Sequence, residues 1–124
     1  MKEWMTVAVG GALGSAARYG AGLAALRLLG VAFPYGTLLV NILGCLGIGL
    51  GAGWGQSRGL LSEGAWLFAA TGFLGGFTTF SAFGLETVGF FAGGQATKAA
   101  LCVAANLAGG LLAVWAGTTL GKRI

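Results

Sequence analysis

Apolar residues occur along this chain in four long runs, which short polar or glycine-containing segments separate. The runs cover about 4–29, 36–56, 62–91 and 95–120. A helix needs roughly 20 apolar residues to span a membrane. Each run is long enough, and because the connections are short, neighbouring helices are expected to be antiparallel. The pattern therefore predicts an all-α integral membrane protein, with four transmembrane helices in a single unit covering residues 1–124.

The separating segments contain the usual signals for turns and helix ends. The only proline, Pro34, lies between the first and second runs, and Arg58 lies in a polar break after the second. Ser62 and Glu63 are predicted to cap the third helix, as a hydroxyl and a first-turn acid. The pair at 93–94, both glycines, is predicted to end it.

Composition agrees with a membrane location. Hydrophobic residues make up 56% of the chain and charged residues 8%, whereas soluble domains contain about 25% charged residues. Glycine accounts for 26 of 124 residues without a G-X-Y period, which suits closely packed membrane helices rather than collagen. The chain has no histidine and no aspartate, so neither a Ser–His arrangement nor a metal constellation can be assembled. We therefore do not expect an enzyme.

Charged residues lie mostly at the ends of the runs and give a net charge of +4. This distribution indicates membrane flanks rather than a nucleic-acid surface. With four spans, one side of the membrane would hold Lys2, Arg58, Lys122 and Arg123, and the other Arg27 and Lys98, with Arg18 added if it reaches the surface. The bias is weak under the positive-inside rule. Two alternatives follow: another signal sets the orientation, or the chain inserts both ways and forms an antiparallel dimer.

Polar residues inside the predicted spans are the candidate functional residues, because such groups are costly at membrane depth. Thr37 and Asn41 are four residues apart on one helix face, which Cys45 continues. Asn41 either forms an interhelical hydrogen bond or donates to a polar path. For Asn106 a structural role is favoured. Arg18 either extends to an interface or faces a water-filled vestibule that attracts anions.

The stretch GFLGGFTTFSAF at 72–83 is the most unusual part of the sequence. A helix tolerates glycine pairs poorly, so we expect Gly75 and Gly76 to break the third helix near mid-membrane. Backbone carbonyls that lose their helical partners at such a break can hold a small cation. The alternative is a pair of packing glycines in a straight helix. If two copies met antiparallel at the break, the carbonyls of both would converge on one point.

The aromatic residues of this stretch are candidates for contact with an anion. Phe80 and Phe83 are three residues apart, and their ring edges are positive. They either present these edges to a narrow passage or form an ordinary lipid-facing stripe, whereas Phe73 and Phe90 are assigned to packing. Glu86 follows Phe83 by three residues, and it lies either near the far interface or along an ion path.

Four segments together resemble the Fluc/CrcB family of small fluoride channels, over nearly the whole chain. GGALGSAARY at 10–19 is similar to the family's first-helix signature and GTLLVNILG at 36–44 to its second. GFLGGFTTFSAF at 72–83 is similar to the third, and NLAGG at 106–110 to the fourth-helix segment. The resemblance implies a passive, fluoride-selective channel, multi-pass in the cell inner membrane, through which cytoplasmic fluoride leaves and does less harm.

The resemblance also implies an antiparallel, dual-topology homodimer with two pores, in contact with fluoride and membrane lipid and not with nucleic acid. Asn41 would be a pore-lining donor, and fluoride would pass the rings of Phe80 and Phe83. The backbone carbonyls of Gly75 and Thr78 would hold a structural sodium ion at the dimer centre. Arg18 would belong to a vestibule. Further candidates for the polar track, its supports or the vestibule are Thr37, Thr79, Ser81 and Glu86.

The chain departs from the family's pattern at two positions. Ala82 stands where the family often has a threonine, and Gly110 stands where it often has a serine. Hydroxyl groups are therefore not expected from these two positions, and the fourth helix is expected to contribute mostly packing.

Two other functions are compatible with the composition. A proton-coupled antiporter or exporter needs an acid inside the membrane, and Glu86 is the only candidate because Glu3 precedes the first span. A structural or accessory membrane subunit would produce no ion flux when purified alone into liposomes.

Overall fold

The computed structural model describes all residues 1–124, and every regular element in it is a helix. The elements are α1 (Lys2–Leu29), α2 (Tyr35–Leu50), the π-helical η1 (Gly51–Gln56), α3 (Glu63–Trp66), the π-helical η2 (Leu67–Leu74), α4 (Gly75–Phe77), α5 (Phe80–Ala92) and α6 (Ala96–Arg123). α2 continues directly into η1, and α3, η2 and α4 form one continuous helical stretch. The helical parts of the chain therefore agree within a few residues with the four predicted runs.

Three helical stretches are long and apolar enough to cross a membrane. They are Tyr35–Gln56, Glu63–Ala92 and Ala96–Arg123, with mean hydropathies of 1.7, 1.2 and 1.9. α1 has 28 residues but falls short of this apolarity, and it contains Arg18 and Arg27. These three helices agree with the membrane location expected from the sequence.

The signals for helix starts and ends work as predicted. The Ser62 hydroxyl accepts a hydrogen bond from the Ala65 backbone N–H at 3.2 Å, with Glu63 in the first turn. α5 ends at Ala92, and Gly94 then adopts a φ of 73°, a left-handed conformation that glycine accommodates without strain. Short connections thus reverse the chain where the sequence indicates.

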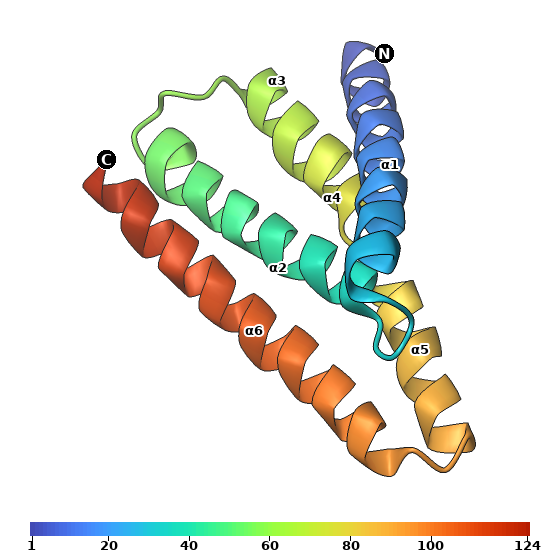
Figure 1. The fold of residues 1–124 in the computed structure, drawn as a ribbon. Coiled ribbons are helices and arrows are strands. Elements are labelled where there is room, and N and C mark those ends of the chain that lie inside the picture. Colours follow the sequence, from blue (N-terminus) through green and yellow to red (C-terminus); the bar gives the residue numbers. More distant parts are fainter.

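Glycine-lined seams join the helices into two closely packed pairs. α2 with η1 lies along α6, and α1 lies along η2 and α4 (Figure 1). At each seam glycine, an added methyl group would overlap the backbone of the opposite helix. The α2–α6 seam contains Gly49, Gly53, Gly117 and Gly121, and the α1 seam contains Gly10, Gly14, Gly72 and Gly76. Small residues therefore bring the backbones into direct contact, as in other membrane helix pairs.

The third helical stretch is broken, but not by its glycines. Gly75 and Gly76 are helical in α4, and a methyl group on Gly76 would lie 2.5 Å from the carbonyl oxygen of Gly11. The extended residues are Thr78, with φ −81° and ψ 161°, and Thr79, with φ −152° and ψ 118°. The expectation that Gly75 and Gly76 break the helix is thus wrong in position. Gly76 serves close packing, and the break falls on two β-branched residues that favour extended backbone.

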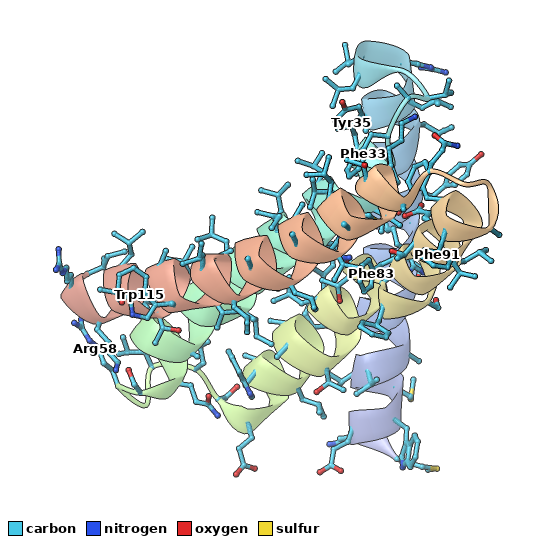
Figure 2. All side chains as sticks on the ribbon, turned by 90° about the horizontal axis from the view of Figure 1, so that it is seen from below. Phe33, Tyr35, Arg58, Phe83, Phe91 and Trp115 are labelled. Atoms are coloured by element: carbon cyan, nitrogen blue, oxygen red, sulfur yellow. The ribbon has the colours of Figure 1, made fainter.

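A single chain buries little of its apolar surface. Only 16 of the 124 residues are buried, and large side chains such as Trp115 and Phe91 are 68% and 73% exposed. Figure 2 shows Trp115 on α6 and Phe91 on α5, on different parts of the molecule. Apolar faces of this extent need lipid or another protein surface to cover them, which agrees with a membrane location.

Candidate functional site

The helix break is paired with a side chain of α2. Because Thr79 is extended, its backbone N–H and C=O point to the same side, as they do in a β-strand. The N–H donates to Asn41 Oδ1 at 2.8 Å, and Asn41 Nδ2 donates to the Thr79 carbonyl at 3.1 Å. The carboxamide of Asn41 therefore acts like a neighbouring strand and satisfies both backbone groups of Thr79.

Asn106 of α6 completes this network. Asn41 Nδ2 also donates to Asn106 Oδ1 at 2.9 Å, and Asn106 Nδ2 donates to the Cys102 carbonyl at 3.0 Å. An asparagine amide has two N–H donors, so both donors of Asn41 are engaged with protein acceptors in this structure. The interhelical hydrogen bond that the sequence allowed for Asn41 is present, and Asn106 is its partner. Contact between Asn41 and an ion stays a prediction.

Arg18 reaches the other residue of the break from α1. Arg18 Nη1 donates to the Thr78 carbonyl oxygen at 3.1 Å, and the guanidinium is half-buried. The side chain is thus directed toward the break, and a vestibule role for Arg18 stays a prediction. A positive charge lies beside the extended segment as a result.

A cavity of about 920 Å³ brings most of the predicted polar residues together. Five of them line it: Arg18, Thr37, Thr79, Ser81 and Glu86. They come from α1, α2, the break and α5, so the cavity lies where these elements converge. One cation, three hydroxyls and a carboxylate in one hollow make a polar environment inside an otherwise apolar chain.

Hydrogen bonds connect the hydroxyls of this cavity. Thr37 Oγ1 donates to Glu86 Oε1 at 2.7 Å, and the hydroxyls of Thr79 and Ser81 are 3.2 Å apart. The second carboxyl oxygen of Glu86, Oε2, is buried and has no hydrogen-bond partner in this chain. Glu86 therefore lies along the cavity wall, and one of its oxygens remains available to a further donor.

A second cavity of about 330 Å³ lies on the other side of the break. Its lining includes Asn41, Thr79, Phe80, Phe83 and Asn106. The rings of Phe80 and Phe83 meet edge to face, with centroids 5.3 Å apart and planes at 67°. Phe80 is 77% exposed and Phe83 only 7%. Within one chain the two rings thus point in different directions, one outward and one into the protein.

Three aromatic side chains that line the larger cavity, Phe33, Tyr35 and Phe90, form a cluster that the sequence pattern did not predict. Phe33 lies 5.4 Å from Tyr35 and 6.1 Å from Phe90, measured between ring centroids, and Lys98 Nζ lies 5.6 Å above the Phe90 ring. Figure 2 shows Phe33 and Tyr35 together where the chain passes from α1 to α2. Assigning Phe90 to packing alone was therefore incomplete, because it also lines the cavity. The aromatic pair that flanks Pro34 was the available signal.

The cation predicted for this protein depends on backbone carbonyls. No group of three or more His, Cys, Asp or Glu residues lies together. The carbonyls predicted for a cation belong to Gly75 and Thr78. The Thr79 N–H, the ordinary helical partner of the Gly75 carbonyl, is directed to Asn41, and a methyl group on Gly75 would approach only the Ala70 carbonyl, at 3.7 Å. The outer side of Gly75 is therefore open.

Comparison with known proteins gives a consistent result. Residues 5–118 match the family described as "CrcB-like protein, Camphor Resistance (CrcB)". A curated relative from Chloroflexus aurantiacus, named "Fluoride-specific ion channel FluC", is 44% identical over 122 residues, 98% of this chain and 97% of the relative. Relatives of the same name from Rhizobium etli and Hyphomonas neptunium are 46% and 44% identical, over the whole of this chain and at least 98% of their own.

Proposed function

Because the chain belongs to the CrcB-like family, we propose that it is a fluoride-selective ion channel, which lets cytoplasmic fluoride leave the cell passively and so reduces fluoride toxicity. The observation that carries this proposal is the full-length similarity to relatives named as fluoride-specific channels, 44% to 46% identical. The protein is a multi-pass membrane protein with three long apolar helices, in keeping with such a function.

The chemistry of the two cavities supports a path for a small anion. Fluoride is small and tightly hydrated, so a selective path must replace water with closely placed donors. The larger cavity offers hydroxyls at Thr37, Thr79 and Ser81, and a cation at Arg18. The smaller offers the Asn41 amide and the edges of Phe80 and Phe83. The groups of the smaller cavity carry no full charge that would trap the ion. This suits conduction, which needs binding that is favourable but weak enough for the ion to leave.

We propose α1 as a fourth membrane span. Its 28 residues exceed the length required. Its glycine seam with η2 and α4 holds it against a helix that is itself apolar enough to span. Arg18, its least favourable residue in lipid, is directed to the Thr78 carbonyl and the larger cavity. Polar residues at membrane depth are tolerated in such internal positions.

We propose that two copies assemble as an antiparallel, dual-topology homodimer. The weak charge bias between the two sides supports insertion in both orientations. The outward ring of Phe80 and the open side of Gly75 both border the smaller cavity. A partner copy on this side would cover the exposed ring and bring the two helix breaks together.

We propose that a structural sodium ion lies at the dimer centre, held by the carbonyls of Gly75 and Thr78 from both subunits. Carbonyl oxygens are hard ligands that suit such a cation, and the redirected Thr79 N–H leaves the Gly75 carbonyl without its ordinary helical donor. Arg18 already donates to the Thr78 carbonyl, so one of its two lone pairs remains. The ion would add a positive charge that both breaks share.

Glu86 supports one competing function, a proton-coupled antiporter, because its unpartnered Oε2 lies beside the larger cavity. Fluoride efflux from liposomes distinguishes the two functions, and it also separates a channel from an accessory subunit. We expect rapid fluoride efflux from protein-containing liposomes, little chloride efflux, and the same fluoride rate with and without a proton gradient. Efflux that stops when the proton gradient is removed would favour the antiporter, and absence of efflux would contradict transport by the purified protein.

A further inference from the structure

The chain contains only two asparagines, Asn41 and Asn106, and they are hydrogen-bonded to each other although 65 positions apart in sequence. Asn106 is 7% exposed and is the one buried polar side chain of the protein. Buried polar groups without a partner are costly, so a buried asparagine that touches a predicted functional residue calls for an explanation beyond packing.

We propose that Asn106 is a positioning residue that fixes the orientation of the Asn41 carboxamide, and through it the geometry of the Thr79 peptide groups at the helix break. The chain of hydrogen bonds runs from Asn106 on α6 through Asn41 on α2 to Thr79 at the break. The effect of this positioning on ion flux rests on the proposed fluoride channel, whereas the orientation of the Asn41 carboxamide does not depend on that function.

The hydrogen-bond donors and acceptors leave one orientation for each amide. The Cys102 backbone carbonyl can only accept, so Asn106 must direct its Nδ2 there and its Oδ1 toward Asn41. The Asn41 atom that faces Asn106 Oδ1 must then be Nδ2, which leaves Asn41 Oδ1 to accept from the Thr79 N–H. A carboxamide turned over by 180° would place two acceptors or two donors opposite each other at each contact.

Without Asn106, the Asn41 carboxamide would lose one of the three hydrogen bonds that fix its orientation. One Nδ2 hydrogen would have no acceptor, and only the two Thr79 contacts would hold the amide. An unsatisfied donor at this part-buried contact costs about 1 kcal/mol, the lower end of the cost of a buried donor, which corresponds to a population change of roughly fivefold. The extended conformation of Thr79, which lines both cavities, would be held less firmly as a result.

The first measurement is a spectrum that needs no flux. Protein labelled with ¹⁵N-asparagine has side-chain signals from Asn41 and Asn106 alone. In the wild type we expect two inequivalent, exchange-protected protons for Asn41. Asn106→Leu, which keeps the approximate size of the side chain, should shift the remaining Asn41 signals and make them exchange faster. Unchanged Asn41 signals in this variant would overturn the proposal.

The second measurement is fluoride efflux per dimer in a double-mutant cycle. Asn106→Leu should lower efflux at least about fivefold, from the cost of the unpaired donor. If Asn106 acts through Asn41, the double variant with Asn41→Ala should be no slower than Asn41→Ala alone. Losses that multiply would overturn the proposal. A wild type without efflux would contradict the channel function, and the spectrum would still decide whether Asn106 positions Asn41.

Two further variants keep the test decisive. Thr118→Val is the matched control, because it removes a polar α6 side chain whose only hydrogen bond is to the Val114 carbonyl. It should leave efflux and the Asn41 signals unchanged, and an equal loss in this variant would count against a specific role for Asn106. If Asn106→Leu does not fold, Asn106→Ser replaces it, since serine can bond the carbonyl four residues earlier but is too short to reach Asn41.

Discussion

Replacing each ring of the Phe80–Phe83 pair by isoleucine separates a role in conduction from a role in packing. The edge-to-face contact at 5.3 Å contributes about 0.5–1.5 kcal/mol, and either substitution removes it. Phe83 is 7% exposed and Phe80 is 77% exposed. Phe83→Ile should therefore cost a further 1–3 kcal/mol or so, less than the roughly 3–5 kcal/mol of a Phe→Ala change because isoleucine fills part of the space. Because Phe80 is exposed within the single chain, Phe80→Ile should carry no such further cost in stability.

Fluoride efflux does not have to follow this order of stability. If both rings present their edges to the ion, Phe80→Ile and Phe83→Ile should each lower efflux, since a positive ring edge facing the ion is lost without replacement. A tenfold loss would correspond to about 1.4 kcal/mol. The assay is fluoride efflux from liposomes per copy of the proposed dimer, with the dimer fraction measured by size-exclusion chromatography and the stability of each variant by thermal unfolding.

Phe91→Ile is the matched control for Phe80→Ile, because Phe91 is similarly exposed, at 73%, but does not line either cavity. It should leave efflux unchanged. If efflux per dimer falls only in the destabilised Phe83→Ile, or falls equally in Phe91→Ile, the rings act by packing and the reasoning is refuted.

Four shorter predictions follow from the same contacts. Asn41→Asp should abolish fluoride efflux, because it replaces two donors by a charge that faces the Thr79 carbonyl, and efflux near the wild-type rate would contradict the predicted role of Asn41. Arg18→Gln removes the cation beside the Thr78 carbonyl, so a sodium ion held there should stabilise the protein more than in the wild type. The rise in melting temperature when sodium replaces N-methylglucamine should therefore be larger in this variant. No sodium effect in either protein would argue against the proposed sodium site. Gly76→Leu should prevent α1 from packing on α4 and lower the yield of folded protein, whereas Gly84→Leu, where a side chain meets open space, should not. A single cysteine in the loop at 57–62, in a protein without Cys45 and Cys102, should be labelled from both sides of the membrane, and labelling from one side alone would contradict dual topology.

The sequence was sufficient for the helices and for the list of polar residues around the break. Long apolar runs and local signals such as Ser62 and Gly94 depend on neighbours in sequence, so their effects could be predicted without the tertiary structure. The pairing of Thr37 with Glu86 and of Arg18 with Thr78 joins residues that are far apart along the chain. Their shared polarity made them candidates, but the distances that join them follow only from how the helices pack.

The position of the break shows where sequence reasoning failed. Glycine is a poor helix former in water, and on that basis Gly75 and Gly76 were expected to break the helix. In a membrane helix the same residue also allows backbone contact, and contact with Gly11 keeps Gly76 helical. The tertiary partner of Thr79, the Asn41 carboxamide, stabilises an extended backbone that local propensity alone does not select.

The seam between α2 and α6 has a consequence for how the protein is made. A ribosome completes η1 at Gln56 and begins α6 at Ala96 about forty residues later, which takes roughly two to eight seconds at ordinary rates of synthesis. During that interval Asn41 has no Asn106 to pair with, and the glycine face of α2 has no partner backbone. The newly made α2 must therefore wait beside the insertion machinery or in lipid, with one Asn41 donor unpaired even after Thr79 has been made. Conditions that slow translation between η1 and α6 should thus reduce the yield of inserted protein before they affect any property of the finished channel.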